Sequence, residues 1–481
     1  HHGSNRPVAQ MEDVTVAIGV ASALVAGGVV AYLLTRSAPP GRKLNPFSAK
    51  MAEGVFAKKV GAPTGAISAA LYFSELPSSA ELQALMRDKL LSFDVFTSVF
   101  RSGYWVPVEV DLAAHVFEAT VGSEAELLAY CETEMVAPLR NSAGAPLWEV
   151  HAVRNTGGGR SMLFFRLEHA IGDGVALNQV LSRLATDSTG APLAPASYTR
   201  PAKPRRSALA LMLEGLCAAL KYVGAPMGRF DSDTPLVPAR KARDPLRFSQ
   251  RRKIVLVPEH RLGLIKRIKD AATASKRGSG AASVTVNDVI FAAAAGALRR
   301  YCLATAPAEP LDGCLVRALC PLAFPRAAEA PLGNDWCFVD VPMPCALPTM
   351  VQRLEASHAA FAAIKGGPEA PVAKVFTDLN CGNPSWMFSH AAQQMMQRYS
   401  LVFSNVPGPT AHVHVCGKQL LGLQAFYPNL IMQGLCVSYA GTMWMNFIVD
   451  PDVVVNHETL PALYMDELRA MAAHFGVDPD A

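Results

Sequence analysis

The sequence predicts a mixed α/β (α+β) protein built in two halves. Of its 481 residues, 51% are hydrophobic, which is enough to bury a sizeable core. Short β-rich runs alternate with helical patterns on both sides of a stretch, residues 198–252, that is rich in proline and basic residues. We therefore expect one unit over residues 44–197, a connecting segment over 198–252 and a second unit over 253–478.

The N-terminal residues are expected to lie outside both units. Residues 1–10, with paired histidines followed by Gly-Ser, are typical of a tag and linker before Met11. No charged residue occurs from Val14 to Leu34, and about 20 apolar residues cross a bilayer as a helix. A secretory signal peptide is the alternative, but Glu12 and Asp13 precede the run where basic residues would be expected. The sequence therefore predicts a transmembrane helix over residues 14–34.

Basic residues after this run indicate its orientation. Arg36, Arg42 and Lys43 follow the predicted span, and the positive-inside rule places such residues on the cytosolic side. We expect a single-pass membrane protein whose large C-terminal part is cytosolic.

In the first unit, a strand leads into a short turn and then a helix. Ala66 to Phe73 is predicted to be a strand, Ala80 to Leu91 a helix and Met162 to Leu167 a buried strand that ends at His169. A helix is expected from Asp173 to Thr186. This order places His169 where its side chain can project into a cleft.

The connecting segment contains an apolar helix, predicted over Ser207 to Val223. Basic residues flank it, among them Lys203, Arg206 and Lys221. Two interpretations stay open: an inter-domain helix packed on protein, and an interfacial helix that dips into a bilayer surface.

The second unit repeats the mixture of helices and strands. A helix is expected to begin near Thr285 and to run through alanine-rich sequence to about Tyr301. Further strands are predicted at Trp336–Val341, Leu401–Asn405 and Met443–Val449, and a final amphipathic helix over His457–Phe475.

Charge and cysteine usage exclude several classes of function. The net charge of +4, spread without long runs, lacks the footprint of a nucleic-acid binder, so no nucleic-acid partner is expected. The ten cysteines form no C-x-x-C pair, which argues against a disulfide framework or a structural zinc site. His412 and His414 alternate without a third ligand, so no metal is expected. The chain also lacks a G-x-S-x-G elbow, a phosphate-binding loop and a dinucleotide-binding fingerprint.

The segment from Glu168 to Gly174 carries the clearest chemical signal. Acyl transfer to an alcohol needs a base for the hydroxyl proton, and histidine has an ordinary pKa near neutral pH. His169 suits that role. Asp173 either pairs with the turn or caps the following helix, and both interpretations make it a positioning residue. A His-x-x-x-Asp spacing alone is common, and a structural histidine is the alternative.

Transfer also needs hydrogen-bond donors for the negative charge on the carbonyl oxygen. Asn287 is a candidate because its amide lies at a predicted helix start. Asp288 follows it as a first-turn residue. From the residues alone, both are better explained as helix-capping residues.

The His169 segment resembles the signature His-His-x-x-x-Asp-Gly of the wax ester synthase/diacylglycerol acyltransferase family, which is related to chloramphenicol acetyltransferase and condensation-domain enzymes. Other family elements occur in the same order and cover nearly all of the chain from Leu44 onward: Trp105 with Asp111 and His115, Pro146-Leu147-Trp148-Glu149, Val286-Asn287-Asp288-Val289, Leu298-Arg299-Arg300-Tyr301, Gly333-Asn334, Ser404-Asn405-Val406-Pro407-Gly408-Pro409 and Ser438-Tyr439.

This resemblance implies two chloramphenicol acetyltransferase-like subdomains with a tunnel at their interface. It implies His169 as general base, Asp173 as its structural partner and Gly174, Asn287 and Asp288 as site-supporting residues. The implied co-substrates are a long-chain acyl-CoA and a fatty alcohol or diacylglycerol, with no further cofactor. Products would be wax esters, triacylglycerol or both. Lipid synthesis makes the endoplasmic reticulum the expected membrane, with a plastid membrane as the alternative.

One residue departs from the family pattern, because Glu168 stands where the family has the first histidine of the motif. Glu168 is expected to be a catalytic residue that orients or charge-stabilises His169 and raises the pKa of the imidazole. If the first histidine of the family motif is needed to bind the acceptor, Glu168 would instead alter the acceptor or impair the enzyme. An acyltransferase for another hydroxylated lipid, such as a sterol or carotenoid, and a non-catalytic lipid-binding relative stay open as alternatives.

Overall fold

The computed structural model describes residues 41–140, 144–194, 207–224, 228–237, 245–275 and 283–479. The predicted tag over residues 1–10 and the predicted span over 14–34 lie outside these ranges. Among the described residues, no helix combines the length and the apolar character that crossing a bilayer requires.

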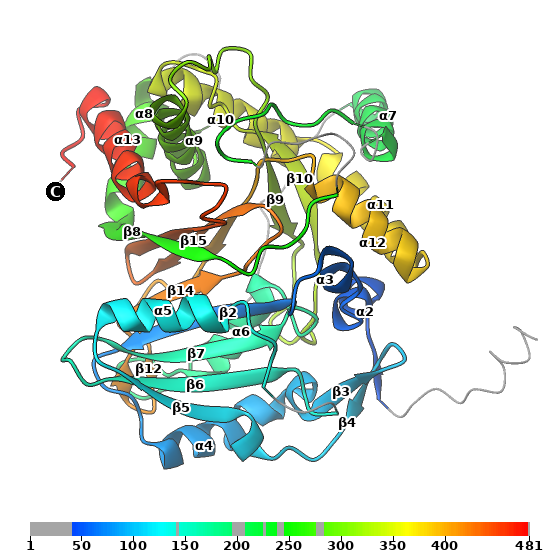
Figure 1. Cartoon of the computed structure of the whole chain (residues 1–481), viewed down its shortest axis with the longest axis vertical. Coiled ribbons are helices and arrows are strands. Elements are labelled where there is room, and N and C mark those ends of the chain that lie inside the picture. The colour runs from blue at the N-terminus through cyan, green and yellow to red at the C-terminus, as the bar shows by residue number, and fades with distance from the viewer. Residues whose placement is uncertain are drawn as a thin grey trace, which may run out of the picture.

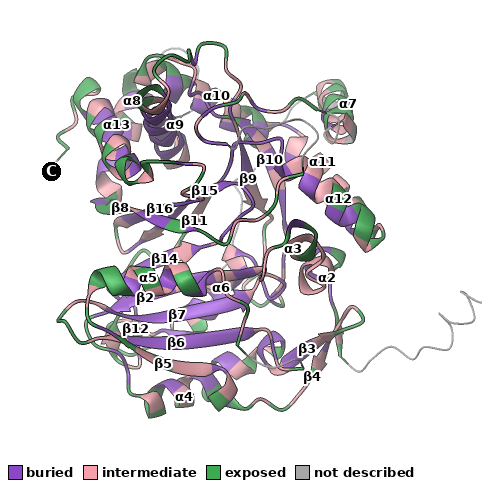
Figure 2. Cartoon of the chain, in the orientation of Figure 1, coloured by how far each residue is buried: buried purple, intermediate pink, exposed green. Residues whose placement is uncertain are grey.

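The first half is organised around a five-stranded mixed sheet (Figure 1). Only the edge pair β5–β6 is parallel. In spatial order the strands are β14 (Gly422–Phe426), β2 (Ala66–Phe73), β7 (Ser161–Glu168), β6 (Trp148–Asn155) and β5 (Val116–Val121). The central strand β7 is almost fully buried, as its run of apolar residues predicts (Figure 2).

Helices and small strands complete this half. Its helices are α2 (Pro46–Ala52), α3 (Val55–Val60), α4 (Ser79–Asp88), α5 (Glu124–Glu134) and α6 (Gly174–Leu184). A three-stranded sheet contains β1 (Arg42–Lys43), β4 (Tyr104–Pro107) and β3 (Ser98–Arg101), and a two-stranded one β12 (His414–Val415) and β13 (Lys418–Gln419).

The second half contains a six-stranded sheet. Its strands, in spatial order, are β10 (Trp336–Pro342), β9 (Arg317–Ala323), β11 (Leu401–Pro407), β15 (Met432–Tyr439), β16 (Thr442–Val449) and β8 (Lys253–Arg261). The helices that follow the connecting segment are α8 (Leu262–Ser275), α9 (Val286–Thr305), α10 (Met350–Gly366), α11 (Glu369–Gly382), α12 (Ser385–Met396) and α13 (Leu460–His474).

Helix α9 lies at the centre of the second core. Its alanine-rich stretch is buried on nearly every side, and it packs against α10 and α13. Small side chains permit this close packing: a Cβ added at Gly296 would lie 2.2 Å from a carboxylate oxygen of Glu467.

One strand crosses between the halves. β14 comes from the C-terminal part of the chain, yet it pairs with β2 and becomes the edge strand of the first sheet. The predicted division into 44–197 and 253–478 does not include this exchange. Local hydrophobic patterns contain no information on which sheet a strand joins, so the exchange could not be read from them.

The connecting segment contains helix α7 (Ala208–Gly224), close to the predicted 207–223. One end packs on α11, where the Tyr222 and Phe376 rings stack with centroids 6.0 Å apart. Lys221 pairs with Glu369 at 2.7 Å. The helix therefore contacts protein along one side, as the inter-domain interpretation requires, while several of its leucines stay exposed.

Candidate active site

His169 lies immediately after β7, where the chain leaves the first sheet. The backbone amide of His169 donates to the carbonyl of Gly65, which precedes β2, at 3.4 Å, and the amide of Ile171 donates to the carbonyl of Glu168 at 2.9 Å. The first bond extends the pairing of β7 with β2, and the second closes a tight turn between β7 and α6, in agreement with the predicted strand, turn and helix.

Two glycines lie at points of close packing where the turn meets α6. A Cβ at Gly172 would lie 2.5 Å from the Cβ of Ala176, inside the first turn of α6. A Cβ at Gly174 would lie 3.2 Å from both methyl groups of Val406 in β11. The predicted supporting role of Gly174 thus has a steric basis: it lets the start of α6 approach the second sheet.

Asp173 caps α6 and joins the two halves. One of its carboxylate oxygens accepts hydrogen bonds from the amides of Val175 and Ala176 at 3.1 and 3.0 Å, and the other from the amide of Asp335 at 2.9 Å. The guanidinium of Arg326 binds both oxygens at 3.2 and 3.0 Å. Asp173 is buried and carries no hydrogen bond to His169, so the structure makes it a positioning residue.

Asn334 is the residue that binds the imidazole. Its Oδ1 lies 3.1 Å from Nδ1 of His169, and its Nδ2 donates to the His169 carbonyl at 2.6 Å and to Ser48 Oγ at 3.2 Å. Its own carbonyl accepts from Nδ2 of Asn45 at 2.8 Å. Asn334 therefore connects the turn at His169, the start of β10 and α2.

A neighbouring tryptophan determines which atom of the Asn334 amide faces His169. Nε1 of Trp336 lies 3.1 Å from Oδ1 of Asn334, and an indole nitrogen can only donate. The contacted amide atom must therefore be the oxygen. Since that oxygen can only accept, Nδ1 of a neutral His169 carries the proton and Nε2 has the free lone pair.

Aromatic rings surround the imidazole. The centroids of Trp336 and Tyr427 lie 5.9 and 5.5 Å from that of His169. Burial lowers the pKa of His169, and the smaller effects of Asp173 and Asn334 raise it. Among the described residues, no protein atom is hydrogen-bonded to Nε2. Burial thus favours the neutral imidazole, and the lone pair on its Nε2 is available to accept a proton from a substrate.

Glu168 does not act on His169 as the sequence suggested. The expected rise in the pKa of His169 is wrong, since the net direction is downward and Glu168 is not among its causes. Burial instead raises the pKa of Glu168 itself to about 7, because neighbouring backbone amides compensate only part of the desolvation. The physical reason is burial: desolvation of the charged form is the largest effect on the pKa of each of the two residues.

A narrow cavity lies beside Glu168 at the junction of the two halves. Its lining comes from α2, α3, Gly65, Phe248 and the segment from Tyr427 to Leu430. Its volume is only about 30 Å³. It has the position of the expected interface tunnel but is too small for an acyl chain, so substrates require side chains to move apart.

The two predicted residues of α9 lie elsewhere. Oδ1 of Asn287 accepts from Asn405 at 3.5 Å, and Asn405 immediately precedes Val406, which packs on Gly174. Asp288 forms a capping box with Thr285 and binds His358 at 2.9 Å. Neither is hydrogen-bonded to His169 in the described part of the chain. Asn287 borders the turn through β11, whereas Asp288 supports the helix start.

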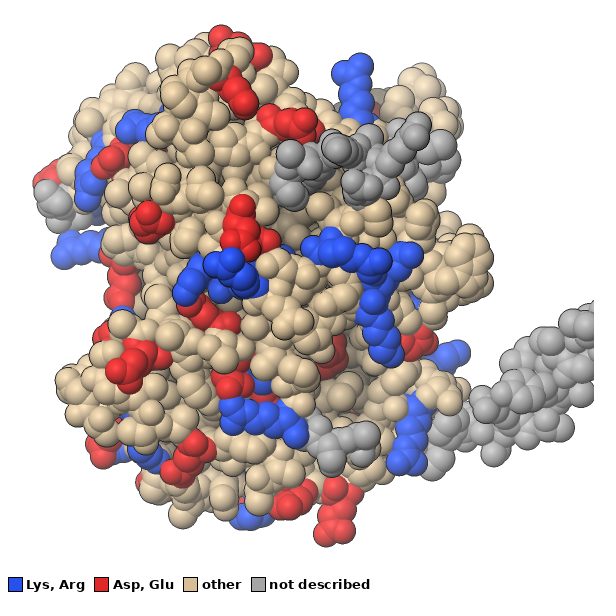
Figure 3. Space-filling model, viewed as in Figure 1, with Lys and Arg blue, Asp and Glu red and all other residues tan. Residues whose placement is uncertain are grey.

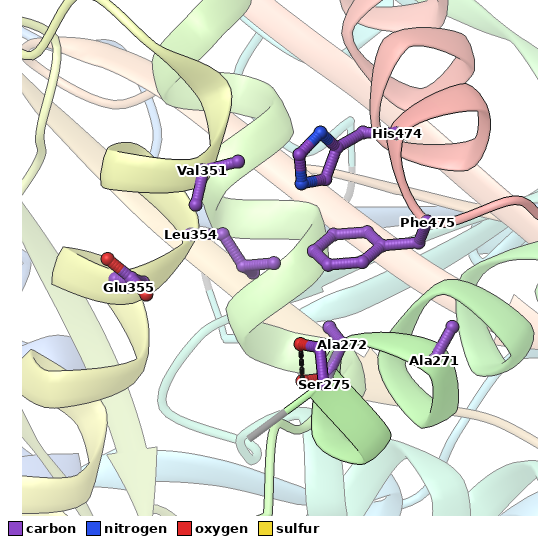
Figure 4. A pocket seen from close by; sticks show the side chains of 8 residues that line it. All are labelled: Ala271, Ala272, Ser275, Val351, Leu354, Glu355, His474 and Phe475. Carbon is purple, nitrogen blue, oxygen red and sulfur yellow. Dashed lines mark hydrogen bonds between the residues drawn. The ribbon is translucent and has the colours of Figure 1, made fainter.

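A second cavity lies within the second half, away from His169. Its lining comes from α8, α10 and the end of α13, where the rings of His474 and Phe475 face Leu354 and Ala272 (Figure 4). Its volume is about 320 Å³. None of its lining residues belongs to β7, α6 or the junction of the halves, so it takes no part in the chemistry described here.

A buried charged cluster could be taken for a metal site. Ligand atoms of Glu134, Glu149 and His151 lie within 4.8 Å of one another. However, the guanidinium of Arg166 contacts both carboxylates, and Arg140 pairs with Glu134. Two arginine cations already supply the positive charge there, and the cluster ties β6, β7 and α5 together.

Comparisons with known proteins agree with the fold. The model of the wax ester synthase/diacylglycerol acyltransferase catalytic domain matches residues 68–305, and that of the WS/DGAT C-terminal domain residues 332–472. A putative diacylglycerol O-acyltransferase of Mycobacterium tuberculosis is 26% identical over 360 residues, covering 69% of this chain and 68% of its own length.

Solved structures show the same architecture. The wax ester synthase/diacylglycerol acyltransferase of Marinobacter aquaeolei superimposes with a TM-score of 0.60 at 18% identity, covering 91% of this chain and all of the other. A condensation domain of the calcium-dependent antibiotic synthetase gives 0.56 at 14% identity, covering 92% and 98%. The starter condensation domain of rhizomide synthetase, in complex with C8-CoA and Leu-SNAC, gives 0.54 at 13%, covering 91% and 95%.

Proposed function

This chain belongs to the wax ester synthase/diacylglycerol acyltransferase family and is an acyl-CoA-dependent O-acyltransferase, and we propose that His169 is its general base. The observation that carries the proposal is the pair of bonds to Asn334 Oδ1, from His169 Nδ1 and Trp336 Nε1, each 3.1 Å long. They fix the tautomer in which Nε2 can accept a proton.

The reaction transfers an acyl group from the thioester to a lipid alcohol. Nε2 of His169 takes the hydroxyl proton as the oxygen attacks the thioester carbonyl, and a tetrahedral intermediate forms. When the C–S bond breaks, the leaving CoA sulfur takes the proton from the imidazolium. The products are an ester and CoA thiol, and His169 returns to its neutral form without a covalent enzyme intermediate.

Several residues hold His169 for this step. Asn334 orients the ring, and Asp173 with Arg326 fixes the start of α6 against the loop before β10. Asn287 is proposed to support the site from the side of β11, and Asp288 to hold the start of α9. Glu168, with its pKa of about 7, is proposed to shape the cavity rather than to take the proton.

The acceptor is proposed to be a fatty alcohol or a diacylglycerol. The family supports a lipid acceptor, and the cavity beside Glu168 is lined largely by apolar side chains, including Met51, Phe56 and Leu430. An expansion of this cavity along the junction of the halves would form the predicted tunnel.

Membrane attachment through residues 14–34 is also proposed, on the charge-free sequence alone. The relatives reported above are bacterial, and bacteria have neither an endoplasmic reticulum nor plastids. The comparisons therefore give no support to the predicted organelle.

The test measures CoA thiol released from palmitoyl-CoA with hexadecanol or diacylglycerol. Ester formation that equals thiol release supports transfer to the alcohol. Thiol release without ester would indicate hydrolysis, and no release with any acceptor would favour a lipid-binding role.

A further inference from the structure

Most of the exposed large apolar side chains in the described part of the chain occur on three surface helices. Ten of the thirteen lie on α7, α11 and α12, and we call these ten the apolar surface: Leu209, Leu211, Met212, Leu213, Leu216, Leu220, Val375, Leu379, Trp386 and Met387. Large apolar side chains that are exposed to solvent and gathered on neighbouring helices mark an interaction site.

The three helices form one continuous face. α7 packs on α11 through Tyr222 and Phe376, and α11 packs on α12. Figure 1 shows them along the same side of the second half, and Figure 2 shows much of α7 and the outer end of α12 as exposed. On the face seen in Figure 3, uncharged side chains cover the region where α12 lies, whereas charges of both signs are mixed elsewhere.

The exposed residues of α7 form one stripe. Leu209, Leu213, Leu216 and Leu220 are spaced by three or four residues, and each is more than half exposed. Trp386 is 71% exposed at the start of α12. Leucine stripes and tryptophan suit the boundary between headgroups and acyl chains.

This face also lies directly outside the proposed active site. Phe388 of α12 belongs to an apolar cluster with Phe47 and Trp336, and the Trp336 ring contacts His169. The cavity beside Glu168 is lined by α2 and α3, against which α11 and α12 pack. A lipid that left a bilayer at α12 would pass the cluster of Phe388 and Trp336 before reaching the imidazole.

Helix α2, which follows the start of the described chain, contacts this face. Lys50 of α2 donates to Ser385 Oγ, at the beginning of α12, at 2.9 Å. The charge-free run Val14–Leu34 ends only seven residues before Gly41, where the described chain begins. The segment proposed to anchor the protein therefore enters the fold through β1 and then α2, and α2 contacts the start of α12.

We propose that the apolar surface docks on a lipid bilayer and delivers the lipid acceptor to His169. This proposal rests on the proposed function. A second copy of the chain is the competing occupant, and the test separates the two.

Tryptophan fluorescence gives a direct test, because Trp105, Trp148, Trp336 and Trp444 are all buried. The full chain is reconstituted into phosphatidylcholine vesicles with brominated acyl chains, which quench tryptophan on contact. We expect quenching in the wild-type protein and its loss in Trp386→Phe. Trp386 fluorescence that is not quenched would overturn the proposal. If light scattering also showed a dimer that the L213E/L216E substitutions dissociate, a second copy of the chain would be the occupant of the apolar surface.

Activity provides a second readout. L213E/L216E is expected to lower kcat/KM for vesicle-borne diacylglycerol at least fivefold and to leave turnover of a short, water-soluble alcohol unchanged. Val455→Glu, at an exposed apolar residue outside the surface, is the matched control and should change neither. Equal activity of all three proteins on vesicles would overturn the docking role. Absence of turnover with both acceptors in the wild type would refute the proposed function instead.

Discussion

Two substitutions of Asn334, which is hydrogen-bonded to His169, are expected to shift the pKa of His169 in opposite directions. Asn334→Leu removes the acceptor of the Nδ1 proton and the donor to the His169 carbonyl, bonds of 3.1 and 2.6 Å. One such bond contributes about 1 kcal/mol net, so losing both should cost about 2 kcal/mol, or roughly 30-fold in kcat/KM.

The pH dependence identifies the cause of that loss. The bond to Asn334 raises the pKa of His169, so Asn334→Leu should lower it and move the acidic limb of kcat/KM to lower pH. Asn334→Asp keeps an acceptor and adds a negative charge, so it should raise the pKa and move the same limb to higher pH.

The assay is CoA thiol release from palmitoyl-CoA over a range of pH, with thermal unfolding to confirm that each variant folds. Ser48→Ala is the matched control, since it removes another partner of the same amide and leaves the bond to Nδ1 in place. A limb that stays fixed in both Asn334 variants, or moves the same way in both, would refute the reasoning.

Three further predictions concern the surroundings of His169. Arg326→Met leaves the buried Asp173 without its cation and should lower the free energy of unfolding by about 3 kcal/mol in denaturant unfolding. Arg251→Met, which removes an exposed ion pair, is the control and should lower it by under about 1 kcal/mol. Equal losses in the two variants would contradict this prediction. Burial raises the pKa of Glu168 to about 7, so its contribution to stability falls as pH rises from about 4.5 to 7. Glu168→Gln should therefore gain about 1–3 kcal/mol over the wild type between pH 5 and pH 8, and a pH-independent difference would exclude this pKa. Asp288→Ala should lower the free energy of unfolding by about 1 kcal/mol or more, through the lost cap of α9, with kcat changed less than by Asn334→Leu; the reverse order would indicate a direct role in the reaction.

Local pattern was sufficient for much of the fold. The runs at 66–73, 162–167 and 443–449 are strands as predicted, and the helix expected from 285 is α9. The predicted helix over 80–91 ends earlier, at Asp88, where a short 3₁₀ turn takes over. Apolar periodicity determines such elements because it decides which face can be buried.

Contacts between residues far apart in the chain could not be predicted from the sequence. β14 joins the first sheet although it lies more than 340 residues after its partner β2, and nothing local to either strand encodes that pairing. Arg326 had no signal at all: its role depends on the loop before β10 meeting the start of α6.

The site was predicted in part. His169 and Asp173 were singled out with their turn, and Gly174 proved to be a point of close approach. Gly333-Asn334 was noted only as part of the family pattern, without a role. The amide faces an imidazole 165 residues away, a contact that only the folded chain reveals.

The imidazole of His169 is proposed to take the proton of the acceptor hydroxyl. The most direct measurement is the rate of CoA thiol release from palmitoyl-CoA with hexadecanol or diacylglycerol in the wild type and in His169→Ala, with thermal unfolding and palmitoyl-CoA binding as controls. We predict a fall of at least about 100-fold in a folded variant that still binds palmitoyl-CoA. Thiol release that persists at the wild-type rate in His169→Ala would contradict the account.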